Sequence, residues 1–271
     1  DALAEIAKIQ ALQNRFDLAA ATIGRAIEMA PGRADLRSVA GRVHQLAAQN
    51  GGGEKELRLA VADLEKAAEL SPGEPAPLRD LTRLYSVLRD TKGALGAWRR
   101  LAEADPRNVD ALIEVATLSV DAGDTDGAVK ALEGAIALDP EDSRSLQMLG
   151  EIQQKAGRVE EALAKYQAAA KLDPSDLVTR LKIGEILLER KDARAALAQA
   201  DEIVKVDEEN RFGRDLKVRA LKELGRTDEA LALAETLAAS DPRDLKAAFL
   251  VITLLEQKGS FEVAEQRLEA L

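Results

Sequence analysis

Apolar residues recur along this chain at intervals of three and four positions, the spacing of helices that each bury one face. The pattern is clearest from Ser145 to Lys155 and from Glu160 to Leu172, where it predicts two helices joined by a turn at Gly157-Arg158. The apolar positions of this pair are Leu146, Leu149, Ile152, Ala162, Leu163, Tyr166, Ala169 and Ala170. One such pair cannot bury its apolar face alone, so it must stack against neighbouring pairs.

The pattern repeats along the chain with a constant period. Proline marks the end of a unit at Pro72, Pro106, Pro140, Pro174 and Pro242, so the successive intervals are 34, 34, 34 and 68. Glu208 fills the gap in the last interval, and the Asp that precedes the proline elsewhere is kept there as Asp207. Pro31 opens the series more than one period before Pro72, so the second unit carries a seven-residue insertion. A fixed period of about 34 residues is typical of solenoid proteins.

Three further positions keep the register of this proline position, which we call the junction. Alanine stands twelve residues before each junction, at Ala19, Ala60, Ala94, Ala128, Ala162, Ala196, Ala230 and Ala264. Glycine stands seventeen residues before four junctions, where a left-handed residue would end the first helix: Gly123, Gly157, Gly225 and Gly259. Helix N-caps are expected two residues after five junctions, at Asn108, Asp142, Asp176, Asn210 and Asp244. The constant alanine indicates close approach of the two helices in a unit, since a larger side chain would push them apart.

We therefore expect an all-α fold in which stacked antiparallel helix pairs form one elongated domain. The expected units are residues 1–33, 34–74 with the insertion, 75–108, 109–142, 143–176, 177–210, 211–244 and a partial unit 245–271.

These residues resemble the tetratricopeptide repeat, a helical hairpin of the same period. The best match is Leu146-x-x-Leu149-Gly150, followed by Ala162, Tyr166, Ala169 and Pro174. The resemblance covers the whole chain and implies a right-handed α-solenoid, or superhelix, that serves as a non-enzymatic scaffold for protein–protein interaction.

Two features depart from the family pattern. The bulky aromatic of the second helix appears only as Trp98 and Tyr166, and the seventh unit has polar Arg214 and Lys217 at apolar positions, so its first helix is expected to be shifted or irregular.

Composition excludes several kinds of site. The 271 residues include 38 Lys and Arg against 48 Asp and Glu, a formal net charge of −10, which argues against nucleic acid as the main partner. There is no cysteine and only one histidine, His44, so thiolate chemistry and sites with two imidazoles are excluded. Carboxylates and lysines show only the spacing of solvated helical ion pairs. We expect no catalysis, no cofactor, no metal and no membrane span within this chain.

Other conspicuous residues have plain structural interpretations. The insertion around Asn50 to Gly53 is expected to lengthen each helix of its unit by about one turn and to form a tolerated surface loop, with a partner contact as the alternative. His44 is expected to be structural rather than a pH switch. Trp98 and Tyr166 are expected to be packing anchors rather than parts of a cofactor site.

The resemblance places the first helix of each unit on the concave side of the superhelix, so ligand contacts are expected seven and eleven positions after each junction. The candidate binding residues are Lys8, Arg42, Arg79, Arg83, Ile113, Thr117, Glu151, Leu181, Glu185 and Arg219. A peptide would find apolar contact surface at Ile113, Leu181 and Phe249. Chaperone-binding members of the family pair Lys with Asn at these two positions of one repeat, and no unit here has that pair, so recognition of a chaperone EEVD tail is not expected.

Arg42, Arg79 and Arg83 form the most unusual electrostatic feature in an acidic chain. Guanidinium groups bind carboxylates in a bidentate manner, so one hypothesis is that the second and third units hold an acidic or C-terminal peptide segment, or an anionic polymer. The alternative is a solvated basic face whose charges are paired with Asp80 and Asp35.

The apolar stretch from Ala247 to Leu255 predicts a helix that is buried on nearly all sides. It suggests self-association through the C-terminal end, or a further repeat or capping helix that follows, because solenoids need a polar terminal face. The chain begins with Asp1, which suggests a processed form or a fragment. An alternative function is therefore the arm of a larger protein, either an extracytoplasmic module for bacterial secretion or exopolysaccharide export or the targeting region of a glycosyltransferase. The compartment stays open between cytoplasm and periplasm.

Overall fold

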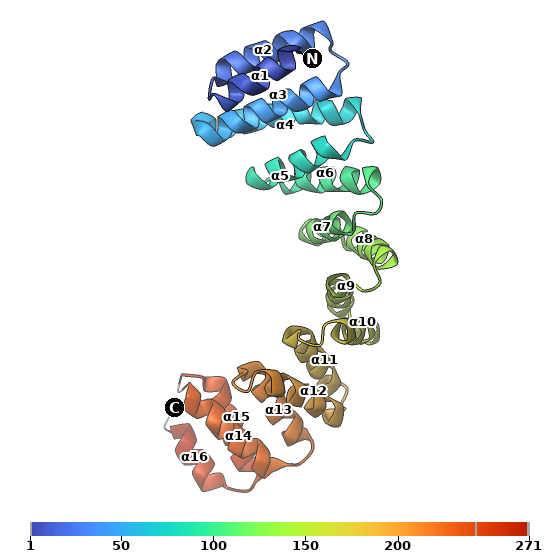
Figure 1. Ribbon diagram of the computed structural model, residues 1–271. Coiled ribbons are helices and arrows are strands. Elements are labelled where there is room, and N and C mark those ends of the chain that lie inside the picture. Colours follow the sequence, from blue (N-terminus) through green and yellow to red (C-terminus); the bar gives the residue numbers. More distant parts are fainter. Residues whose placement is uncertain (1, 242, 270–271) are drawn as a thin grey trace. The chain divides into compact units, whose positions relative to one another are not determined.

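The computed structural model describes residues 2–241 and 243–269. Asp1, the junction residue Pro242 and the expected end of the eighth unit at Leu271 lie outside these residues, as does Ala270. The chain divides into two compact bodies, residues 1–140 and 141–271, here called the N-terminal block and the C-terminal block. Within each block helix pairs stack one on the next (Figure 1).

The described residues contain helices and turns and no strand. The N-terminal block contains α1 (Ala2–Leu12), α2 (Phe16–Met29), α3 (Ala34–Ala47), the π-helical segment η1 (Ala48–Gly52), α4 (Gly53–Leu70), α5 (Pro75–Val87), α6 (Thr91–Ala104), α7 (Val109–Asp121) and α8 (Thr125–Leu138). The C-terminal block contains α9 (Ser143–Lys155), α10 (Val159–Leu172), α11 (Leu177–Glu189), α12 (Ala193–Val206), α13 (Arg211–Glu223), α14 (Thr227–Ser240), α15 (Leu245–Gln257) and α16 (Phe261–Glu269).

Each expected unit contributes one helix pair, which confirms the all-α solenoid of stacked antiparallel pairs. The helices α7, α9, α11, α13 and α15 begin one sequence period apart, from Val109 of α7 to Leu245 of α15. In the N-terminal block the first helices α5 and α7 lie together on one side and the second helices α6 and α8 on the other (Figure 1). This arrangement places α5 and α7 on a common surface of the block.

The alanine that stands twelve residues before each junction is buried in every unit. None of the eight exposes more than 3% of its surface, from Ala19 in α2 to Ala264 in α16. Because protein interiors are close-packed, a longer side chain at this position would separate the two helices of its unit. The expected close approach is confirmed.

The turn inside seven of the eight units places one residue in the left-handed region. The four glycines expected there have φ between 71° and 82°. Asn14, Arg89 and Lys191 occupy the same position in three other units, with φ of 60°, 56° and 63°. The sequence pattern therefore identified the position through glycine, while the backbone adopts the same turn without it.

Side chains cap the helices at the expected positions and at others. Asn108, Asp142, Asp176, Asn210 and Asp244 each accept hydrogen bonds from the first turn of the helix that follows. The structure adds a second set, at the start of three second helices, where Asp90, Asp124 and Asp192 accept from the third residue beyond. Both sets satisfy backbone N–H groups that the helix itself leaves free.

The insertion lengthens its helix pair as expected. The second helix α4 spans 18 residues where other second helices of the N-terminal block span 14, and α3 continues into η1. Gly51 and Gly53 adopt positive φ, so the chain reverses there. His44 in α3 is half-buried, and its Nδ1 lies 2.7 Å from Glu56 Oε2 of α4, a contact that joins the two lengthened helices.

The seventh unit does not have the irregular first helix that its polar residues suggested. The helix α13 spans 13 residues in register with the others, so that prediction was wrong. Arg214 donates from Nε to the Glu208 carbonyl at 2.7 Å, and Lys217 Nζ lies 2.7 Å from Asp201 Oδ1. Long side chains can keep their charged ends hydrogen-bonded while their aliphatic stems pack, which is why the helix tolerates them.

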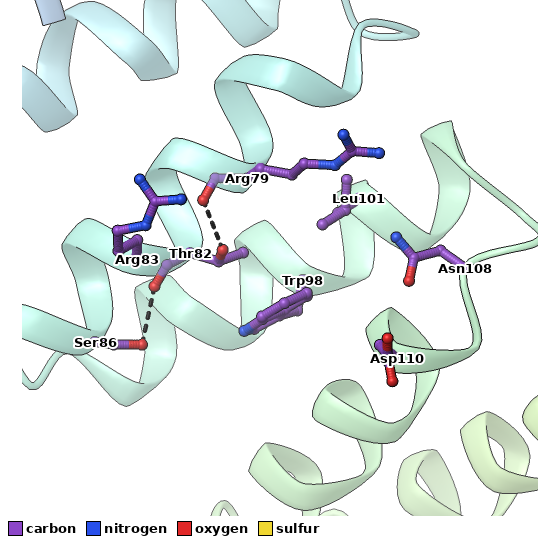
Figure 2. Close-up of a pocket in the computed structure, with 8 residues that line it drawn as sticks. All are labelled: Arg79, Thr82, Arg83, Ser86, Trp98, Leu101, Asn108 and Asp110. Atoms are coloured by element: carbon purple, nitrogen blue, oxygen red, sulfur yellow. Dashed lines mark hydrogen bonds between the residues drawn. The ribbon is translucent and has the colours of Figure 1, made fainter. Parts of the chain in front are cut away.

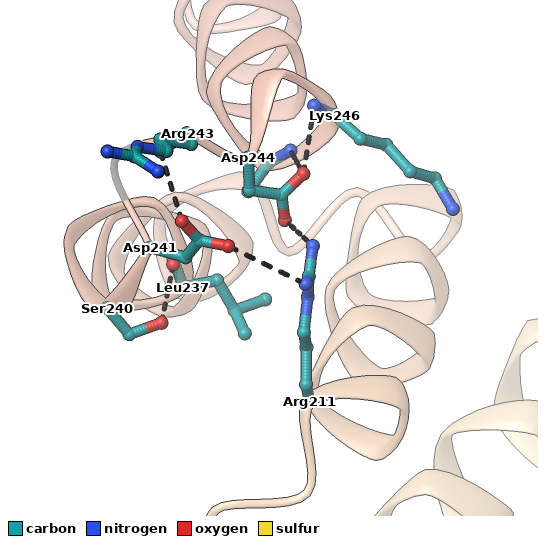
Figure 3. Close-up of polar contacts among 8 residues, drawn as sticks. Arg211, Leu237, Ser240, Asp241, Arg243, Asp244 and Lys246 are labelled. Atoms are coloured by element: carbon teal, nitrogen blue, oxygen red, sulfur yellow. Dashed lines mark hydrogen bonds and ion pairs between the residues drawn. The ribbon is translucent and has the colours of Figure 1, made fainter.

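The same helix is tied to the following junction by Arg211. Its guanidinium pairs with Asp244, the N-cap of α15, and lies 3.9 Å from Asp241 (Figure 3). Apolar α15 is largely buried, as expected, although Leu245 and Phe249 are exposed. Among the described residues, no helix has both the length and the apolar character needed to cross a bilayer.

Candidate functional site in the first helices of the N-terminal block

The basic candidates of the N-terminal block lie on the first helices α1, α3 and α5. They border two hollows, and both hollows include residues of α5. The first hollow has a volume of about 540 Å³ and is lined by residues of α1 and α3, including Lys8 and Arg42, and by the start of α5. Glu5, Asp35 and Glu74 also line it, so its charge is mixed.

The second hollow, called the Trp98 pocket, has a volume of about 470 Å³. Its lining residues are Arg79, Thr82, Arg83, Ser86, Trp98, Leu101, Asn108 and Asp110. Figure 2 shows the Trp98 ring of α6 between the arginines of α5 and Asp110 at the start of α7. Two of the predicted residues, Arg79 and Arg83, therefore share a pocket with the only tryptophan of the chain.

The three arginines are paired loosely. Asp80 lies 3.5 Å from Arg42 and 3.6 Å from Arg83, while Arg79 lies 3.4 Å from Asp105. Each arginine side chain is more than half exposed. Charge-assisted hydrogen bonds are shorter, about 2.7–2.9 Å, and exposed pairs contribute little stability.

Other ion pairs of the same block have shorter N–O distances. Arg37 lies 2.7 Å from Asp63, and Arg99 lies 2.6 Å from Asp124. Asp80 pairs with the basic face, as the alternative interpretation expected, whereas Asp35 pairs with Arg33. The guanidinium groups of Arg42, Arg79 and Arg83 therefore retain the capacity to form short bonds with a further carboxylate.

Trp98 is less buried than its counterparts in six other units. The residue at this position is at most 1% exposed at Ile23, Leu64, Leu132, Tyr166, Ala200 and Ala234. Trp98 is half-buried: it packs against the core of α4 to α7 and also presents its ring to the pocket. It is thus a packing residue, as expected, with an accessible face.

The opposite residue on the first helix explains this difference. Tyr166 seats its ring against Gly150, where an added Cβ would come within 2.9 Å of the ring. Gly41 gives similar room to Leu64. In the third unit the corresponding residue is Thr82, which is buried, so the larger indole meets a larger neighbour. Because interiors are close-packed, the buried Thr82 side chain takes space that a glycine would leave to the indole, and Trp98 is only half-buried.

Two candidates on α7 contribute less to this surface. Ile113 is buried, with 9% of its surface exposed, so it packs inside and offers little apolar surface to a ligand. Thr117 is exposed, but its hydroxyl donates to the Ile113 carbonyl at 3.0 Å. Neither residue lines the two hollows.

The candidates of the C-terminal block surround Tyr166 or are already paired. Burial raises the pKa of Tyr166 to about 12, with further contributions from the carboxylates of Glu151 and Glu185. The Tyr166 hydroxyl donates to Gln154 Oε1 at 3.0 Å and its ring is buried, which confirms its role as a packing anchor. Glu151 is exposed and Glu185 partly so.

Leu181 and Arg219 complete the predicted set. Leu181 is half-buried against the cluster around Ile203 and Leu216, so its surface is partly used in packing. Arg219 lies 2.8 Å from Asp215, one turn before it on α13. Among the described residues of the C-terminal block, these candidates do not form a group like the three loosely paired arginines.

Sequence reasoning did not place Trp98, Thr82 and Ser86 at the site. The sequence did contain an indication. Trp98 is the largest residue found at its position in the repeat, and the first helix of its unit has Thr82 where the second and fifth units have glycine. Among the residues that the structure describes, no group of three potential metal ligands comes together.

The chain was compared with known proteins. The family model described as Tetratricopeptide repeat matches residues 116–176 and 216–271. These two segments of the chain carry tetratricopeptide repeats. No curated protein matches the sequence.

Solved structures of other proteins share the fold. YrrB, described as a TPR protein with an unusual peptide-binding site, is 20% identical with a TM-score of 0.54, over 72% of this chain and 97% of that one. PilF of Pseudomonas aeruginosa is 19% identical with a TM-score of 0.54, over 78% of this chain and 96% of that one. A structure of Naa15/Naa10 bound to HypK-THB is 18% identical with a TM-score of 0.64, over 93% of this chain and 39% of that one. At these identities the comparisons show a shared fold.

Proposed function

We propose that this chain is a non-enzymatic interaction scaffold whose N-terminal block holds an acidic peptide segment of a partner protein. The observation that carries the proposal is the position of Arg42, Arg79 and Arg83 on the rims of two hollows that both border α5. These arginines are more than half exposed and loosely paired, so a ligand carboxylate gains bidentate bonds without breaking a strong ion pair.

The fold is compatible with this role. Within the N-terminal block α1 packs against α3, and α5 lies beside α7 (Figure 1). YrrB is a tetratricopeptide-repeat protein described by its peptide-binding site. An extended peptide placed along this surface would cross α1, α3 and α5 and meet one hollow after the other. Charge complementarity favours an acidic segment and also its rate of association.

A binding titration tests the proposal. A capped, fluorescent peptide of alternating Glu and Gly is titrated with the wild type and with the double variant Arg79→Glu/Arg83→Glu, and its anisotropy is measured. We expect the double variant to bind at least about tenfold more weakly, because two attractive contacts become repulsive. Arg58→Glu/Lys66→Glu is the matched control, since both residues lie on α4, are 72% and 50% exposed and line neither hollow.

Two results would contradict the proposal. The first is equal affinity of the peptide for the wild type and the double variant. The second is saturable binding of the polysaccharide alginate with no binding of the peptide, which would assign the surface to an anionic polymer.

A further inference from the structure

The Trp98 pocket joins an apolar surface to a cationic rim. Trp98 and Leu101 of α6 provide the apolar surface, and Arg79 and Arg83 of α5 provide the charge. We propose that this pocket receives an aromatic side chain of the bound segment, next to a carboxylate that pairs with the two arginines. The inference rests on the proposed function, because it assumes that the segment binds along this face.

The pocket has room for an aromatic ring. Its volume of about 470 Å³ falls within the range of about 300–1,000 Å³ found for small-ligand sites. Aromatic rings pack in offset or edge-to-face arrangements, so the accessible part of the Trp98 ring offers a partner for a second ring. Guanidinium groups also stack on aromatic faces, which allows Arg79 and Arg83 to contact the ring as well as the acid.

The hydroxyl groups in the pocket wall are already hydrogen-bonded within the protein. The Thr82 hydroxyl donates to the Arg79 carbonyl at 2.9 Å, and the Ser86 hydroxyl donates to the Thr82 carbonyl at 2.9 Å (Figure 2). Both hydroxyl protons are therefore used within α5. An apolar side chain can enter without leaving these donors unsatisfied.

The charges on the two sides of the pocket determine on which side the ligand carboxylate can lie. Asp110 lines the pocket on the α7 side, opposite the arginines of α5. A ligand carboxylate beside Asp110 would be repelled, so the acid must lie on the α5 side of the aromatic ring. Asn108 is fixed on the α7 side, because its Oδ1 accepts from the Ala111 N–H at 2.9 Å as the N-cap of α7.

Fluorescence of the only tryptophan reports on the pocket directly. Two unlabelled peptides, the alternating Glu and Gly host with a central Phe and the same host with a central Ala, are titrated against the wild type. We expect the Phe peptide to bind roughly tenfold more tightly and to change the Trp98 emission. Equal affinity of the two peptides overturns the inference.

A double-mutant cycle separates recognition from folding. Trp98→Leu introduces the residue that Leu64 and Leu132 provide at this position, so the helix pair should still form. With labelled peptides and anisotropy as the readout, we expect this variant to lose the preference for Phe while it binds the Ala peptide as the wild type does. Equal weakening of both peptides would show a merely structural Trp98 and would overturn the inference.

Thr82→Gly provides a second test that alters neither the ring nor the charges. It gives the first helix the glycine that Gly150 supplies opposite Tyr166, so Trp98 can seat more deeply. We expect a blue-shifted emission and a reduced preference for the Phe peptide. An unchanged preference in the presence of that blue shift would contradict the pocket assignment.

The outcomes distinguish the two proposals. If the Phe and Ala peptides bind equally but both depend on Arg79 and Arg83, the acidic-segment scaffold holds and the aromatic inference fails. If neither peptide depends on the arginines, the proposed function itself fails.

Discussion

At the scale of the residue, the turn inside seven of the eight units depends on one left-handed position. Gly123 is an example. Its N–H donates to the Val120 carbonyl, and the Asp124 N–H donates to the Ser119 carbonyl. These two hydrogen bonds form a Schellman motif. Arg89 makes the same turn with a side chain that disfavours it. Non-glycine residues in this region are strained by about 1–2 kcal/mol.

Arg89→Gly should therefore stabilise the N-terminal block by up to about 1 kcal/mol, the relief of strain less the added freedom of the unfolded chain. Urea denaturation followed by circular dichroism measures the change. Lys130→Gly, at an exposed helical position of α8, is the control and should destabilise by about 1 kcal/mol. A loss of stability in Arg89→Gly would contradict the strain argument.

The cap Asp142 makes stability depend on pH. Burial works against its charge, but hydrogen bonds from Ser145 and Arg144 outweigh that effect and hold the pKa of Asp142 below its usual value. A carboxyl with a lowered folded pKa contributes stability above the unfolded pKa of about 4, and loses it as the pH falls through the folded pKa. Its contribution is therefore complete at neutral pH.

We expect Asp142→Ala to destabilise the C-terminal block by about 1 kcal/mol at pH 7, as is typical for loss of an N-cap. The difference from the wild type should shrink as the pH falls below about 4, because the wild-type carboxyl is then protonated. Urea midpoints measured across this range give the comparison. A difference that stays constant would exclude the charge as the source of the effect.

At the scale of the element, the spacing between the two helices of a unit is set by one alanine. Ala162 on α10 is fully buried, and the ring of Tyr166, one turn later, packs against Gly150 on α9. Small residues on both helices thus accept one large side chain between them. The third unit shows the consequence of changing one of these residues, since Thr82 leaves Trp98 half-buried.

Ala162→Leu should destabilise the C-terminal block by about 1–3 kcal/mol, the usual effect of overpacking a well-packed core. Ala164→Leu is the matched control, because Ala164 lies on the same helix and is exposed. The control should change stability by less than about 0.5 kcal/mol. Thermal or chemical denaturation of both variants is the measurement, and equal effects would remove the packing explanation.

At the scale of the whole molecule, the net charge of −10 and the local basic rim act over different distances. The Debye length is about 8 Å at physiological ionic strength, so most of the acidic surface is screened from a bound peptide. Contacts with Arg79 and Arg83 act at hydrogen-bond range and persist. An acidic partner can therefore bind an acidic scaffold.

Raising the salt concentration from about 0.1 M to 0.5 M should weaken binding of the Glu and Gly peptide several-fold. In Arg79→Gln/Arg83→Gln the affinity should be lower and should depend less on salt, because two of the three arginine pairs are absent. Anisotropy titrations at both salt concentrations test this expectation. A salt dependence that is unchanged in the variant would show that other cations hold the peptide.

The repeat period determined the helix pairs, their turns and their buried alanines, because these depend on spacing along one chain. It could not show that α13 remains regular with Arg214 and Lys217, since their partners Glu208 and Asp201 come from the end of the preceding unit. The sequence also placed the arginines on the first helices, but not beside Trp98. That pocket exists because Thr82, Trp98 and the start of α7 meet only when the pairs stack, and packing across units is decided by three-dimensional volume rather than by sequence spacing.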